Sequence, residues 1–99
     1  LQRVQRRSRA QFGELAAEAF EKFVAFDRAA LADGAIPVKY KELMAVAVAL
    51  TTQCPYCIDL HVRKAREAGA TEKELAETVL VAAALRAGGA VAHGTHCVG

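Results

Sequence analysis

The stretch LMAVAVAL, residues 43–50, decides the fold of this 99-residue chain, because eight apolar residues follow one another in it without a polar side chain. Nowhere in the chain is the alternation typical of a half-buried strand sustained, and alanine, the strongest helix former, supplies about a fifth of the residues. We therefore expect a helix from Val38 to about Thr52. A helix that is apolar on every side must be surrounded by other protein surface.

An earlier helix is predicted by the spacing of the apolar residues that precede this stretch. Between Phe12 and Ala30 they recur at intervals of three and four, which places one apolar stripe along a helix from about Ser8 to Ala32. Gly34 is expected to end this helix, and Pro37 prevents it from resuming.

A third helix is expected to begin at Pro55. The fixed φ of proline suits the first helical position, and its missing N–H would be unpaired there in any case. Cys54 is then the residue that caps the helix, and the pair Ala68-Gly69 ends it.

A fourth helix is predicted by a capping box, in which the side chains of Thr71 and Glu74 each satisfy a free backbone N–H at the helix start. We expect this helix to run to about Ala87. The pair Gly88-Gly89 is expected to break or bend the chain there, and the mixed residues after it leave the last segment open.

Length and composition predict a single domain, residues 1–99, because a chain of this size has no room for a second core. The apolar content of 54% excludes intrinsic disorder. Four of the thirteen basic residues are arginines in the first ten positions, so we interpret residues 1–11 as an N-terminal extension. With eleven acidic residues, the remainder has a net charge of −2, and a nucleic-acid partner is not expected.

The longest apolar runs, residues 43–50 and 79–85, are much shorter than the roughly 20 residues that span a bilayer, so we expect no membrane-spanning segment. A polar stretch follows the basic start, which is unlike a signal peptide. Two helices of this apolar character exceed what so small a chain covers alone, and we expect an obligate homo-oligomer. The alternative is a compact bundle with these two helices at its centre.

The candidate chemistry lies in the stretch CPYCIDLH, residues 54–61. Cys54 and Cys57 fall at the start of a helix, where the helix dipole stabilises a thiolate. His61 lies one turn beyond Cys57 on the same face, where its imidazole can take the thiol proton. These residues predict a dithiol beside a base: one thiolate attacks an electrophile, and the second thiol captures the product as a disulfide. Such a motif belongs to a reducing compartment, and we expect a cytoplasmic protein.

Two other interpretations of the paired cysteines were weighed. A thioredoxin-like protein places this motif after a strand, and no strand signal precedes Cys54. Zinc is the stronger alternative, although the spacing fits no usual zinc finger. Three of its ligands would be Cys54, Cys57 and His61. The fourth would be His93, His96 or Cys97.

Five features together resemble the carboxymuconolactone decarboxylase-like superfamily, and within it the alkylhydroperoxidase D-like branch. They are KEL (41–43), the apolar run, CPYCIDLH (54–61), AGAT (68–71) and the two glycines at 88 and 89. The resemblance covers about residues 12–98. It implies an all-α bundle of about five or six helices, assembly into trimers or hexamers, and cofactor-free, thiol-dependent reduction of hydroperoxides by way of an external dithiol reductant.

The resemblance also implies a role for each residue of the motif. Cys57 would be the peroxidatic cysteine, which passes through a sulfenic acid, and Cys54 would be the resolving cysteine. His61 would help to deprotonate Cys57, and Glu42 would orient His61 and relay its proton. The helix dipole alone favours Cys54 as the more acidic thiol, whereas the position of His61 favours Cys57.

Without the resemblance, Glu42 would be interpreted only as a first-turn acid that complements the helix dipole. The resemblance selects it over Asp59 and Glu67. Three alternatives to a peroxidase remain from the sequence: a lyase like the γ-carboxymuconolactone decarboxylase, a zinc-binding protein, and a redox sensor without catalytic turnover. The presence of both cysteines argues against the lyase, which needs no redox dithiol.

Overall fold

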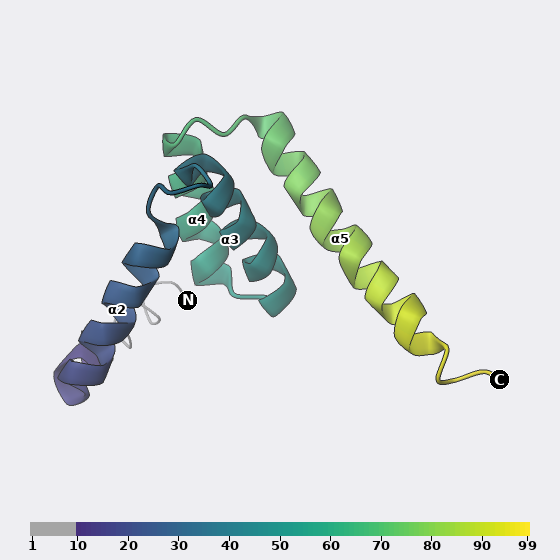
Figure 1. The fold of residues 1–99 in the computed structure, drawn as a ribbon, viewed down its shortest axis with the longest axis horizontal. Coiled ribbons are helices and arrows are strands. Elements are labelled where there is room, and N and C mark those ends of the chain that lie inside the picture. The colour runs from purple at the N-terminus through teal and green to yellow at the C-terminus, as the bar shows by residue number, and fades with distance from the viewer. Residues whose placement is uncertain (1–9) are drawn as a thin grey trace.

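The computed structural model describes residues 10–99, and within that range the regular secondary structure is all helical, without a strand. Residues 10–15 form a short helical segment that a bend at Ala16 separates from α2. The longer helices are α2 (Ala17–Leu31), α3 (Val38–Thr52), α4 (Pro55–Glu67) and α5 (Glu72–Gly94), shown in Figure 1. The expected all-α class is confirmed. Most of the predicted N-terminal extension, residues 1–9, lies outside the described residues.

The central helix is α3, which packs along α4 on one side and against the first half of α5 on another, while α2 touches it near the connecting loop. The buried apolar residues come from α3, α4 and α5. They are Val46 and Ala49 of α3, Ala65 of α4, and Leu75 and Ala82 of α5. The apolar run 43–50 therefore lies at the centre of the fold, but the chain does not surround it as its sequence predicts, because Met44 and Val48 are 50% and 60% exposed.

The start of α3 is stabilised by the loop that follows α2. The capping position holds Pro37, which has no side-chain acceptor, and Asp33 Oδ1 instead accepts from the N–H of Val38 at 2.8 Å. Lys41 Nζ donates to the carbonyl of Ala32 at 2.6 Å. The helix before this loop ends at Leu31, one residue before the predicted end at Ala32, whereas the single helix predicted from Ser8 onward is interrupted by the bend at Ala16.

The expected break at Gly88-Gly89 is wrong, because α5 continues through both glycines to Gly94. A glycine inside a helix costs about 1 kcal/mol relative to alanine, and that cost alone does not end a helix. Neither position has a positive φ, and a Cβ at either would meet no atom within 4 Å. The glycines thus act as ordinary, weakly destabilising helix positions in this chain.

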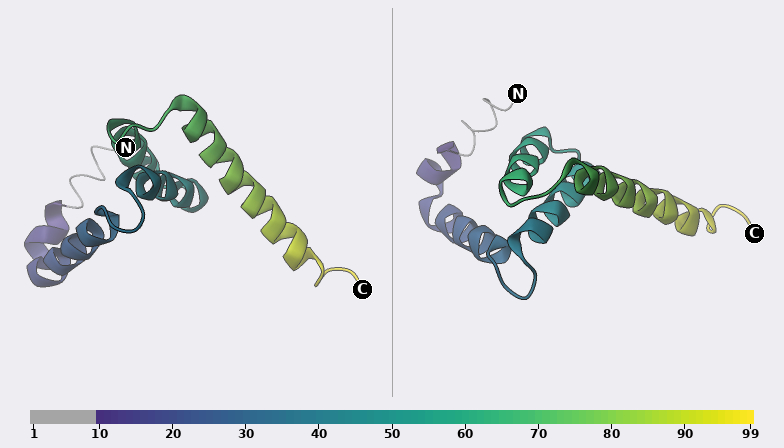
Figure 2. Two further views of the ribbon diagram at one scale, coloured as in Figure 1. Left: turned by 45° about the horizontal axis from the view of Figure 1, so that its top comes forward. Right: turned by 90° about the horizontal axis from the view of Figure 1, so that it is seen from above.

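The second half of α5 extends away from the other helices, as Figures 1 and 2 show from three directions. Beyond Ala82 no residue of α5 is buried, and Leu85 and Val91 are 69% and 74% exposed. The radius of gyration is 16.4 Å, against about 13 Å for a compact domain of this length. The chain by itself leaves the second half of this apolar helix uncovered.

The length of α5 also bears on the expectation, drawn from the short apolar runs, that the chain has no membrane-spanning segment. As a continuous helix of 23 residues with a mean hydropathy of 1.5 over its most apolar window, α5 has the length and composition of a helix that can cross a bilayer. It is the one such helix among residues 10–99. Length and composition are shared by the core helices of oligomers, so they do not by themselves assign α5 to either setting.

Candidate functional site

The candidate site forms where α3 ends and α4 begins. Gln53 adopts a left-handed conformation, with φ 57°, and turns the chain between the two helices. Cys54 then caps α4, since its Sγ accepts from the N–H of Cys57 at 3.2 Å, and Pro55 occupies the first helical turn. The predicted cap and start of this helix are both confirmed.

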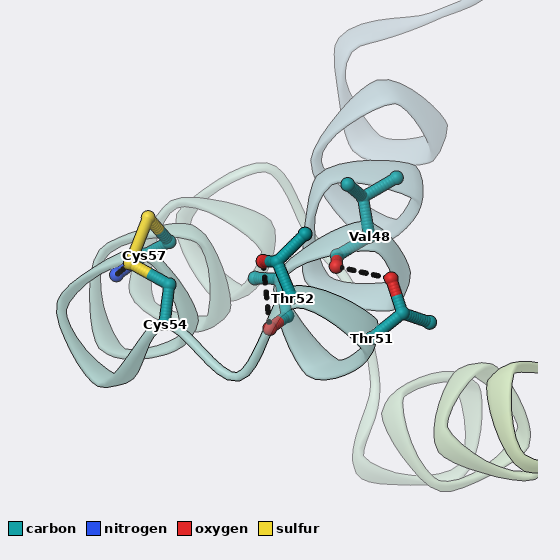
Figure 3. Close-up of a disulfide and its surroundings, with 6 residues drawn as sticks. Val48, Thr51, Thr52, Cys54 and Cys57 are labelled. Carbon is teal, nitrogen blue, oxygen red and sulfur yellow. Dashed lines mark hydrogen bonds between the residues drawn. A yellow bond between two sulfur atoms is a disulfide. The ribbon is translucent and has the colours of Figure 1, made fainter.

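The two cysteines are joined by a disulfide across one helical turn, with their Cα atoms 5.2 Å apart. Figure 3 shows the disulfide beside the end of α3, where the hydroxyls of Thr51 and Thr52 donate hydrogen bonds to backbone carbonyls of the same helix. Both cysteines are half-buried. The turn between α3 and α4 thus brings two sulfur atoms close enough to form and break a bond without a change of fold.

Glu42 and His61 meet across the interface of α3 and α4, although nineteen residues separate them in sequence. Glu42 Oε1 lies 2.6 Å from His61 Nδ1, and the two side chains are only 5% and 14% exposed. With the carboxylate ionised, Nδ1 carries the hydrogen of this bond and Nε2 is left as a proton acceptor. The packing of the two helices therefore orients an imidazole one turn beyond Cys57.

The C-terminal histidines and the third cysteine belong to a different part of the molecule. His93 and His96 lie at the end of α5 with ring centroids 6.4 Å apart, and Cys97 is a free, exposed thiol. The end of α5 points away from α3 and α4 in every view (Figure 2). Within residues 10–99 no group of three or more His, Cys, Asp or Glu side chains is arranged to hold a metal ion, so the geometry gives no support to the zinc interpretation.

Two hydrogen bonds that the sequence did not predict hold α5 against α3. Lys39 Nζ donates to Glu74 Oε2 at 3.0 Å near the start of α5, and Arg86 Nη1 donates to the carbonyl of Thr51 at 2.7 Å further along it. The backbone N–H of Thr71 and then Lys39 hold the pKa of Glu74 below its ordinary value. Glu74 in turn raises the pKa of Lys39. In each of the two hydrogen bonds, donor and acceptor lie 35 residues apart in sequence. No local sequence pattern could therefore have indicated either bond.

Two hollows flank the site. One, of about 530 Å³, runs along α4 from Pro55 to Val62 with Leu50 and Ile58 in its wall and is mainly apolar. The other, of about 420 Å³, lies between α2, α3 and α4 and reaches Glu42. The site is thus bordered by an apolar groove on one side and by a charged cavity on the other.

The site thus combines a cysteine pair at a helix start with a glutamate–histidine pair one turn away, inside an all-helical fold. Residues 17–98 match the model of the carboxymuconolactone decarboxylase family, and this chain belongs to that family.

Similar proteins occur in several microorganisms. An uncharacterised protein of the cox locus in Paracoccus denitrificans is 49% identical over 73 residues, which are 74% of this chain and 66% of that protein. An uncharacterised protein of Cupriavidus necator is 36% identical over 74 residues, 72% of this chain and 66% of that protein. The chain thus spans just under two thirds of the length of these two relatives.

Two solved structures have the same fold. A carboxymuconolactone decarboxylase family protein from Legionella pneumophila has a TM-score of 0.77 at 35% identity, over 84% of this chain and 74% of that one. A protein from Methanobacterium thermoautotrophicum has a TM-score of 0.82 at 36% identity, over 89% of this chain and 99% of that one.

Proposed function

We propose that this protein is a thiol-dependent peroxidase of the alkylhydroperoxidase D-like kind, which reduces organic hydroperoxides through the Cys54–Cys57 pair. The observation that carries the proposal is the buried contact between Glu42 and His61, one helical turn from a dithiol that closes into a disulfide. A structural disulfide has no need of an oriented base beside it. A peroxidatic thiol does, because only the thiolate is a strong nucleophile.

In the proposed cycle, Nε2 of His61 takes the proton of the Cys57 thiol. The thiolate attacks the terminal peroxide oxygen, so that an S–O bond forms, the O–O bond breaks, and the leaving alkoxide takes the proton back from His61 to become an alcohol. Cys57 is now a sulfenic acid. The Cys54 sulfur attacks the Cys57 sulfur, which forms the disulfide and releases water.

An external dithiol completes the cycle. It reduces the Cys54–Cys57 disulfide by thiol–disulfide exchange and becomes a disulfide itself, so the net reaction converts a hydroperoxide and a dithiol into an alcohol, water and a disulfide. The protein residues carry every step, and the proposal includes no cofactor. We place this chemistry in the cytoplasm, where thiol reductants keep such a pair reduced between turnovers.

We also propose that the working form is a homo-oligomer, a trimer or a hexamer. The chain exposes 7378 Å², about 1,900 Å² more than expected for a monomer of 10.6 kDa. A standard interface covers about 800 Å² per partner, so the excess corresponds to an extensive obligate contact. The exposed apolar side chains of α5, with Leu80 and Leu85 among them, are the surface that a second copy would cover.

A thiol titration tests the proposed cycle. One equivalent of an organic hydroperoxide should remove two of the three thiols of the reduced protein together, and Cys97 should remain free. The Cys57→Ser variant should lose this reaction, whereas Cys54→Ser should accumulate a sulfenic acid that a trapping reagent labels. Cys97→Ser is the matched control and should behave as the wild type.

Turnover is then measured with dithiothreitol as the dithiol donor and the alcohol as the product. Continuous alcohol formation supports a peroxidase. Disulfide formation without turnover would replace the peroxidase by a redox sensor, and the absence of any thiol loss would reject the cycle. If Cys54→Ser, instead of Cys57→Ser, abolishes sulfenic acid trapping, the two cysteines have the opposite roles.

A further inference from the structure

Three hollows around Leu50 join into one apolar surface that α3, α4 and the first half of α5 share. The apolar groove along α4 and a hollow of about 300 Å³ have Leu50, Ile58 and Val62 in common. A third hollow, of about 330 Å³, shares Leu50 and Val79 with the second. We call this continuous surface the Leu50 trough, and no segment of residues 10–99 fills it.

The charged residues around the Leu50 trough are mostly engaged within the chain. Arg66 Nε donates to Glu72 Oε1 at 3.0 Å, and Arg86 Nη1 donates to the carbonyl of Thr51 at 2.7 Å. Asp59 is the remaining charged residue of the lining. An occupant therefore meets a mainly apolar surface, which suits an uncharged apolar segment better than a charged one.

The second half of α5 is such a segment. Between Arg86 and the helix end at Gly94 there is no Asp, Glu, Lys or Arg, and every residue except Val91 and His93 is Ala or Gly, so this half is slim as well as apolar. It cannot reach the trough of its own chain, because α5 is continuous and ends about 18 Å beyond Ala82, the last buried residue of the helix. The trough that it can enter belongs to another copy.

The exposed area agrees with two such contacts per copy. The excess of about 1,900 Å² over a monomer of this mass is a little more than twice the roughly 800 Å² that one partner buries in a standard interface. A contact that joins two different patches, a helix end and a trough, gives each copy two neighbours. Each copy inserts its helix into one neighbour and receives a helix from the other, and the chain of contacts closes as a ring.

We propose that the second half of α5 of one copy lies in the Leu50 trough of the next copy and there closes the candidate site beside Cys54. Gln53 and Pro55, the two sequence neighbours of Cys54, both line the trough at this end. The inserted helix therefore covers one flank of the disulfide, and a complete site needs two copies. This inference rests on the homo-oligomer proposed above and adds the two surfaces that meet in it.

Charge substitutions on both surfaces test the contact in the full chain by sedimentation velocity. Val91→Lys places a cation on the inserted helix and Ile58→Lys places one in the trough, so each should dissociate the assembly toward the 10.6 kDa chain. Val79→Lys should do the same from a trough position that is 45% exposed in the single chain, where a lysine does not disturb folding. Val98→Lys is the matched control, since Val98 is 77% exposed and lies beyond the end of α5, and it should leave the assembly intact.

Mixing two variants identifies which surfaces meet. The Val91→Lys chain keeps an intact trough and the Ile58→Lys chain keeps an intact helix, so an equimolar mixture should form a two-chain complex that neither chain forms alone. Only the Val91→Lys chain then has its trough filled. Its Cys54–Cys57 disulfide should be reduced by dithiothreitol more slowly in the mixture than alone, whereas that of the Ile58→Lys chain should be reduced at the same rate in both, as mass spectrometry of the two chains measures.

Four outcomes would overturn the inference. They are an assembly that withstands Val91→Lys, an assembly that withstands both trough substitutions, a mixture whose chains stay separate, and a Val91→Lys disulfide that is reduced equally fast in the mixture and alone. A response to Val91→Lys without one to the trough substitutions would leave α5 to another surface or to a bilayer.

The failure of this inference differs from the failure of the proposals on which it rests. A wild-type chain that sediments as a monomer removes the proposed oligomer together with this contact. An oligomer that withstands the trough substitutions removes this contact only. The measurements require no peroxide, so their result is independent of the proposed peroxidase.

Discussion

Replacing Glu42 by Gln removes one negative charge from the site and almost nothing else. Gln has the shape of Glu, and its carbonyl oxygen can still accept from His61 Nδ1, so the 2.6 Å contact can persist as a neutral hydrogen bond. A charge-assisted hydrogen bond contributes about 1.5–3 kcal/mol and a neutral one about 1 kcal/mol. The expected loss of stabilisation of the imidazolium is therefore about 0.5–2 kcal/mol, or roughly a factor of 2–30 in the rate at which Cys57 is activated.

The assay is peroxide consumption by the reduced protein in a stopped-flow instrument, with urea unfolding measured alongside. We expect kcat/KM for an organic hydroperoxide to fall by roughly 10-fold, within the factor that the lost charge assistance gives. The free energy of unfolding should change by less than about 1.5 kcal/mol, because both partners remain hydrogen-bonded.

Glu67→Gln is the matched control, since Glu67 is an exposed acid at the end of α4 and should leave both quantities unchanged. A Glu42→Gln protein that reduces peroxide within twofold of the wild-type rate would refute the reasoning. The carboxylate would then serve the packing of α3 on α4 and not the ionisation of the thiol.

Three further outcomes are expected. The backbone N–H of Thr71 and then Lys39 lower the pKa of Glu74, so the stability that this carboxylate contributes is present above its ordinary pKa of 4.5 and is lost as the pH falls through the lowered value. Glu74→Gln should therefore lower Tm near neutrality and flatten the fall in Tm below about pH 4.5, so that the two proteins converge in acid. Gly88→Ala should raise the free energy of unfolding in urea by about 0.5–1 kcal/mol, since the position is helical and open, whereas a loss of stability would indicate that another copy approaches the backbone there. Leu85→Lys places a charge on the exposed face of α5 and should shift sedimentation toward the 10.6 kDa monomer. A wild-type protein that pellets with membranes and needs detergent for extraction would contradict the oligomer and assign α5 to the bilayer.

What the sequence could predict was mostly local. The caps at Cys54 and Thr71 depend on atoms within one helical turn, and both are present in the structure. The break at Gly88-Gly89 was wrong for a local reason too, since glycine weakens a helix without supplying a competing turn. The end of α2 at Leu31 is within one residue of the prediction, whereas the bend at Ala16 within the predicted helix was not indicated by the spacing of its apolar residues.

The spacing of residues in the sequence predicts less of the candidate site than of the helices. Cys54, Cys57 and His61 share one helix, so their proximity follows from helical geometry. The partner of His61 on α3 does not follow from it, and Glu42 was selected only by resemblance to a family. The cavity on the far side of Glu42 depends on how α2 crosses the other two helices, and no pattern in the sequence indicates that crossing.

The sulfur of Cys54 has two roles: it accepts the hydrogen bond that caps α4, and it forms half of the disulfide. Redox state and folding are therefore linked in one thermodynamic cycle. The difference in free energy of unfolding between the oxidised and reduced chains equals the difference in free energy of reducing the disulfide in the folded and unfolded chains. A substitution that strengthens the start of α4 in only one redox form must shift the reduction potential by the same amount of free energy, even when it lies far from either sulfur.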